Sequence, residues 1–80
     1  MIIITENSQV INCTGDFVVN VTQENVNEFH LVLSLPNFRY PITLGIFLSV
    51  KDANKQLNGL ATALTSGMKT FAVNKTFCGN

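Results

Sequence analysis

The stretch that decides the fold is Phe29–Leu44, FHLVLSLPNFRYPITL, in which two alternating apolar segments flank a turn. Up to Leu35, every second residue is Phe or Leu, the period of a strand with one buried face. The alternation resumes at Phe38, so the second segment is predicted to return as an antiparallel strand. The Pro-Asn turn between them favours a loop slightly longer than two residues. Pro41 cannot donate a ladder hydrogen bond, which predicts an irregular or edge-facing stretch there.

Shorter strand patterns precede this pair. Ile2–Ile4 and Gln9–Ile11 flank the turn-forming Glu6–Ser8, which predicts a small hairpin. Phe17–Val21 alternates again and is predicted to be the next strand. The polar residues Gln23–Asn27 are predicted to form a loop before Phe29.

The period changes after Ser49, which is predicted to cap a helix with Asp52 three residues later. The helix should span about residues 50–66, with Gly67 just beyond its end. Apolar residues spaced three and four apart mark its predicted buried face: Val50, Ala53, Leu57, Leu60, Ala61 and Leu64. Gly59 lies mid-helix at a cost of about 1 kcal/mol against alanine. We therefore expect another backbone to approach closely there.

These patterns predict an α+β fold. A small antiparallel β-meander of about five to six strands would carry the helix on one face, and Lys69–Val73 would add a short last strand. Eighty residues make a single domain, 1–80, in which residues 74–80 form a loose tail.

The surface is predicted to carry little charge. Charged residues are 12% of the chain, against roughly 25% in an average protein, while hydrophobic residues are 46% and the mean hydropathy is +0.28. One interpretation is a monomer with a neutral polar surface. The other, which we favour, is a homo-oligomer that hides part of this surface.

Charge and hydropathy also limit the partners. The net charge is zero and there is no basic patch, which argues against nucleic-acid binding. The most apolar of the later stretches, Pro41–Val50, is far shorter than the ~20 residues of a membrane span. The first residues lack a basic segment followed by a long apolar one, so we expect no signal peptide and a cytoplasmic protein. Cys13 and Cys78, which could form at most one disulfide, should then stay reduced.

No residue pattern indicates catalysis or a cofactor. His30 is the only histidine, and with Cys13 and Cys78 distant in sequence it makes a poor metal-ligand set. The two cysteines lack a CxxC spacing and are interpreted as plain thiols. We expect a protein that is not an enzyme, has no catalytic or metal residues and needs no cofactor.

Arg39 is the leading candidate for recognising an anion, because it is the only arginine and lies between Phe38 and Tyr40. Arginine can contact a phosphate with two hydrogen bonds while neighbouring rings stack on a base. The competing interpretation, favoured by strand alternation, places the two aromatic rings in the core and Arg39 in water. The candidate ligand-binding residues are Arg39, Tyr40, His30 and Lys69.

Several short motifs resemble a group of short, largely uncharacterised proteins of Gram-positive bacteria and their phages. They are Met1–Ile4, the Leu44-Gly45 pair before the capped helix, and Gly67 leading into Lys69–Val73. The helix of this chain has fewer charged residues than the helix of those proteins. Whether it would bind the same partner is therefore left open. The resemblance carries no catalytic residue. It implies a phage or mobile-element accessory protein that acts by binding.

Together these observations predict a non-enzymatic, homo-oligomeric binding protein that counters a host process. It would sequester a small nucleotide-like ligand or block a host protein by presenting a sheet edge or helix face. The alternative is a structural or assembly component of a phage or bacterial particle.

Overall fold

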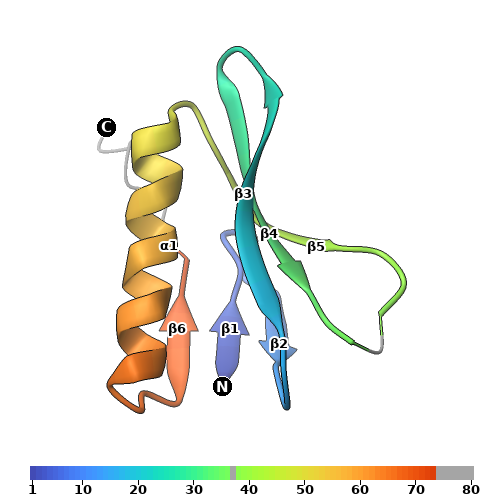
Figure 1. The fold of residues 1–80 in the computed structure, drawn as a ribbon, viewed down its shortest axis with the longest axis vertical. Helices are drawn as coiled ribbons and strands as arrows, with labels where there is room; N and C mark the ends of the chain where they lie inside the picture. Colours follow the sequence, from blue (N-terminus) through green and yellow to red (C-terminus); the bar gives the residue numbers. More distant parts are fainter. Residues whose placement is uncertain (37, 74–80) are drawn as a thin grey trace.

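The computed structural model describes residues 1–36 and 38–73, which form six strands and one helix (Figure 1). The elements are β1 (Ile2–Ile4), β2 (Val10–Asn12), β3 (Val18–Asn25), β4 (Glu28–Ser34), β5 (Ile42–Phe47), α1 (Val50–Thr65) and β6 (Thr70–Ala72). They confirm the predicted α+β fold, with a β-meander and a single helix packed on it. The strands are divided between two three-stranded sheets, ordered β3-β4-β5 and β2-β1-β6. The predicted loose tail, residues 74–80, lies outside the described residues.

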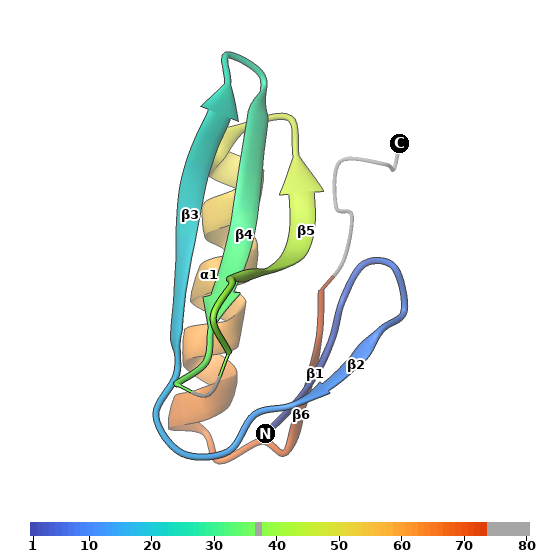
Figure 2. The ribbon, with the colours of Figure 1, turned by 90° about the vertical axis from the view of Figure 1, so that its right-hand side faces the viewer.

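The meander is built around β4, as its alternation predicts. Leu31 and Leu33 are fully buried, while His30 points to the opposite face and is partly exposed. β4 pairs antiparallel with both neighbours, and a bulge in β5 lies between the pairs Leu31–Gly45 and Val32–Thr43. The bulge leaves Leu44 unpaired in the ladder but fully buried. The core of the molecule therefore lies on the face of the meander that α1 covers (Figure 2).

The predicted polar loop is shorter than expected, because β3 continues to Asn25 and only Val26 and Asn27 form the turn. Local hydrogen bonds join the polar side chains at this tip. Gln23 Nε2 donates to the Asn25 carbonyl at 3.2 Å, and Asn25 Nδ2 donates to Glu28 Oε1 at 3.2 Å. Polar strand residues are tolerated there because they are exposed to water.

The prediction for the return strand was wrong at its start. β5 begins at Ile42, after the predicted irregularity at Pro41, and the described residues 35–36 and 38–41 lie outside both strands. Phe38 and Tyr40 are therefore not core residues: they are 58% and 73% exposed. Alternation alone could not show this, because the pattern continues on both sides of Pro41. Proline cannot donate to a ladder, so the pairing with β4 begins only after Pro41 and leaves Phe38 and Tyr40 outside the sheet.

The second sheet joins the two ends of the described chain. β1 and β2 form the predicted antiparallel hairpin, but β6 pairs parallel to β1, whereas a purely antiparallel sheet was expected. The cause is α1, which runs back along the meander so that β6 leaves in the same direction as β1 (Figure 1). The turn after β1 also reaches the meander. The Glu6 N–H donates to the Leu44 carbonyl at 3.0 Å, and the Ile46 N–H donates to Glu6 Oε1 at 3.2 Å.

The ends of α1 agree with prediction to within one residue. At its start, the Asp52 N–H donates to Ser49 Oγ at 3.2 Å. At its end, Gly67 has a φ of 74° and the Met68 N–H donates to the Ala63 carbonyl at 2.9 Å, which makes a Schellman motif. In the described part of the chain, neither α1 nor any other helix is long and apolar enough to cross a membrane.

The buried face of α1 is turned from the predicted one. Its buried residues are Ala53, Gln56, Leu60 and Ala63. Val50, Ala61 and Leu64, predicted to be buried, are exposed instead. The helix carries apolar residues around more of its circumference than the sheet covers, so periodicity alone could not fix the rotation. On the other flank, a Cβ on Gly59 would lie 3.3 Å from Phe71 Cε1, so the close approach predicted there is by a ring of β6 and not by a backbone.

Candidate binding surface

Arg39 and Tyr40 lie in the loop between β4 and β5, whose described residues are 35–36 and 38–41, at the end of the meander where β4 stops. Both are exposed, and so is the neighbouring Phe38. The Phe38 N–H donates to the Leu35 carbonyl at 3.1 Å, which turns the chain away from the sheet. Because Phe38–Tyr40 are not part of a strand, their side chains do not alternate between two faces. All three are therefore exposed, including the two aromatic rings that a strand would have buried.

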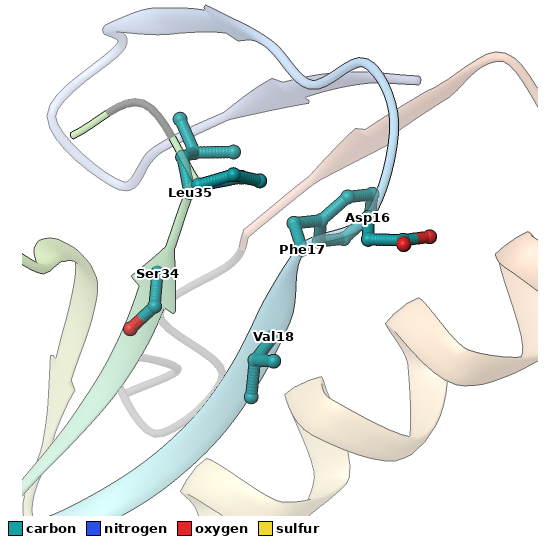
Figure 3. A pocket seen from close by; sticks show the side chains of 6 residues that line it. Asp16, Phe17, Val18, Ser34 and Leu35 are labelled. Carbon is teal, nitrogen blue, oxygen red and sulfur yellow. The ribbon is translucent and has the colours of Figure 1, made fainter.

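Two hollows adjoin this loop and share Leu35 and Pro36 as a common wall. The larger has a volume of about 310 Å³ and lies between the end of β4 and the start of β3 (Figure 3). Figure 3 shows Leu35 extending from the end of β4 toward the start of β3, where Phe17 lies. Asp16 also lines this hollow, and its carboxylate disfavours an anion there.

The smaller hollow has a volume of about 150 Å³ and includes Phe38 in its wall together with Asn12 and Thr14. It is below the roughly 300–1,000 Å³ typical of pockets that enclose a drug-sized ligand. It therefore suits one part of a ligand, with an amide and a hydroxyl able to donate hydrogen bonds. Sequence reasoning missed Asn12 and Thr14, because they lie on and after a short strand far from the loop in sequence.

His30 is not brought to this loop. It lies in β4 opposite Thr22 and Ile46, and it is three residues from the Leu33–Ile42 pair that precedes the loop. At about 3.3 Å per residue, that places it roughly 10 Å away along the strand. His30 Nε2 lies 2.6 Å from Glu28 Oε2. This hydrogen bond and a second one from Asn25 lower the pKa of Glu28.

Lys69 is also separate from the loop. It is exposed just before β6, and its carbonyl accepts a hydrogen bond from the Ile2 N–H at 2.7 Å. Figure 1 shows β6 beside α1 on one side of the molecule and the β4–β5 loop on the other. Of the four predicted ligand-binding residues, only Arg39 and Tyr40 therefore lie together.

Of the two cysteines, only Cys13 lies among the residues that the structure describes. Cys13 is free and buried, and its N–H donates to the Met1 carbonyl at 2.8 Å. Burial raises the pKa of this thiol, while the nearby N-terminal ammonium acts in the opposite direction. Cys78 lies outside the described residues. Within residues 1–36 and 38–73, no three His, Cys, Asp or Glu side chains come together as a metal site requires.

The Cys13 thiol should react slowly while the protein is folded. In a Cys78→Ser variant, we expect alkylation by iodoacetamide at pH 8 to be about 100-fold slower in buffer than in urea, because the reagent needs local opening of the hairpin. Mass spectrometry over time measures both rates. A Cys13→Ser, Cys78→Ser double variant gives the background, and equal rates with and without urea would contradict the buried position.

Comparison with known proteins gives no relative. No family model matches the chain, and neither the curated proteins nor the solved structures contain a match. The predicted relationship to short proteins of Gram-positive bacteria and their phages therefore stays a prediction.

Proposed function

We propose that the protein is a non-enzymatic binding protein that works as a homo-oligomer and sequesters a small anionic, nucleotide-like ligand at Phe38–Tyr40. The observation that carries this proposal is the exposure of an arginine between two exposed aromatic side chains, beside hollows lined by polar and apolar residues. Exposed aromatic side chains offer faces on which a base can stack. The planar guanidinium group of arginine can donate two parallel hydrogen bonds to the oxygens of a phosphate.

The parts of such a ligand would be divided among neighbouring side chains. Arg39 would hold the phosphate, and Tyr40 or Phe38 would stack against the base. Asn12 and Thr14, in the wall of the smaller hollow, would donate hydrogen bonds to a sugar or base edge. Each of these roles is binding and none moves a proton or breaks a bond.

Sequestration suits a phage or mobile-element accessory factor in the host cytoplasm. A protein that removes a nucleotide signal needs affinity and abundance and does not need turnover. This role is consistent with the resemblance noted in the sequence. Blocking a host protein, or serving as a component of a particle, has no comparable support from an observed group of side chains.

The proposal predicts that a nucleotide stabilises the fold. In a thermal-shift panel of mono-, di- and cyclic nucleotides, a ligand at 100 times its Kd adds about 2.7 kcal/mol to the free energy of unfolding. For a domain of this size, that raises Tm by roughly 10 °C or more. Arg39→Ala should abolish the shift without changing the Tm of the free protein, because Arg39 is exposed.

Lys55→Ala is the matched control, since it also removes an exposed cation, from α1. It should keep the full shift. A panel in which no nucleotide raises Tm would overturn the proposed ligand class. A shift that Arg39→Ala leaves intact would overturn the proposed site.

A further inference from the structure

The helix α1 carries a second stripe, apolar except for Asn54, besides the one that packs on its own sheet. Its members follow one another at spacings of four, three, four and three: Val50, Asn54, Leu57, Ala61 and Leu64. This is the spacing of a coiled-coil seam, along which one helix packs against another. Val50 and Leu64 are 48% and 46% exposed, and Ala61 and Asn54 are exposed too, while Leu57 is partly buried against the core. The described chain therefore leaves most of this stripe uncovered.

The stripe borders the outer edge of β3. A hollow of about 160 Å³ lies between them, with Phe17 and Val19 on one side and Leu57, Ala61 and Leu64 on the other. Figure 1 looks onto this flank and shows β3 and α1 side by side, with no other described element in front of them. Helix stripe and strand edge therefore form one continuous surface.

The outer edge of β3 is the less protected edge of the meander. β3 pairs only with β4, and Val18–Gln23 contains no charged residue and no proline, the usual devices that keep an edge from pairing. The edge of β5, by contrast, is met by the backbone and side chain of Glu6. A partner that adds a strand would therefore bind beside β3.

The surface is self-complementary. Val50 and Leu64 each lie seven residues from Leu57, so a twofold axis through Leu57 pairs them across two antiparallel helices. The same axis brings β3 against an antiparallel copy of itself, because Val19 lies at the same hollow as Leu57. Antiparallel edges of one strand can form a regular ladder about such an axis.

Charge and size fit a second copy. Neither the helix stripe nor Val18–Gln23 has an ionisable side chain, and the net charge of the chain is zero, so two copies meet without repulsion. The stripe is about 21 Å long, and a helix layer with a sheet layer is about 20 Å deep. A flat face of these dimensions, counted on both copies, would bury about 800 Å² in total. The uneven surface of the side chains adds to this area, which brings it close to the roughly 1,000 Å² that a specific interface needs.

We propose that a second copy of this chain binds this flank, so that β3 and α1 each pair antiparallel with their counterparts about one twofold axis. The dimer would be a continuous six-stranded sheet with two helices on one face. This inference rests on the homo-oligomer of the proposed function and specifies where its copies meet. It assigns no role to Phe38–Tyr40.

Ala61→Arg tests the flank directly, because it would place a long charged side chain inside the apolar contact, about one helical turn from the twofold axis. Sedimentation of the wild type should approach twice 8.8 kDa as concentration rises. The variant should weaken association by at least about 100-fold, since an unpaired charge buried in an apolar interface is strongly unfavourable. Thr62→Arg is the matched control: it adds the same charge at the next, exposed residue of α1, outside the stripe, and should associate like the wild type.

Amide hydrogen exchange gives an independent readout. Protection of the β3 amides should rise with concentration in the wild type and in Thr62→Arg but not in Ala61→Arg. If Ala61→Arg associates as strongly as the wild type, the flank is not the interface, although the homo-oligomer stands. If the wild type stays monomeric, both the flank and the homo-oligomer fall, and the nucleotide titration still decides the ligand site on its own.

Discussion

Phe47→Ala should lower the free energy of unfolding by about 4 kcal/mol, the loss expected when a buried phenylalanine leaves a cavity. Phe47 ends β5, is fully buried and pairs in register with Phe29. A single domain has only about 5–15 kcal/mol of total stability, so this variant should lie near the limit of folding. Urea denaturation followed by circular dichroism at one fixed protein concentration measures the loss.

Ile46→Ala is the control for Phe47. Ile46 is the preceding residue of the same strand, points to the other face and is 40% exposed. Its loss should cost about 1 kcal/mol or less, because only part of its side chain leaves water. A similar cost for both variants would show that β5 does not present Phe47 to the core.

Gly45→Val should cost about 3 kcal/mol, as overpacking of a core does. A Cβ on Gly45 would already lie 3.1 Å from two ring carbons of Phe47 and from Val73 Cγ1. Valine adds two further methyl groups where the meander meets the chain beyond β6. The result would run against strand propensity, which favours valine over glycine. Thermal and urea unfolding both report the change.

Gly59→Ala makes a useful comparison for Gly45. Its Cβ would meet only the edge of the Phe71 ring, at 3.3 Å and 3.5 Å. Alanine also gains about 1 kcal/mol of helix propensity over glycine. The two effects nearly cancel, so stability should change little. A loss as large as that of Gly45→Val would mean that α1 and β6 pack more tightly than the structure shows.

Local sequence patterns predicted the elements whose causes are local. The alternation from Phe29 to Leu35 predicted β4 and its buried face, since both depend on a period of two. Ser49 and Gly67 predicted the ends of α1, because caps act on the backbone groups beside them. These features need no knowledge of the rest of the molecule.

The features that were missed depend on contacts between distant segments. The rotation of α1 is set by which part of its wide apolar surface the sheet covers, so Ala61 and Leu64 could not be assigned in advance. The parallel pairing of β6 with β1 follows from the direction in which α1 returns the chain. The hollow beside Phe38 was invisible for the same reason, because Asn12 reaches it from β2.

The candidate site was predicted in part. Arg39 and Tyr40 were identified by residue type and adjacency, and the structure leaves both exposed in one loop. His30 was selected as the only histidine, yet it is engaged with Glu28 on a strand of the meander. Lys69, the fourth candidate, lies apart from the loop because β6, which it precedes, joins the other sheet.

The homo-oligomer of the proposed function, and with it the interface at β3 and α1, requires that a chain with so few charged side chains joins another copy of itself. Light scattering on the unmodified protein after size-exclusion chromatography, from micromolar to millimolar concentration, measures this mass directly. We expect it to rise toward twice 8.8 kDa. A mass that remains at 8.8 kDa throughout that range would contradict the homo-oligomer and its interface.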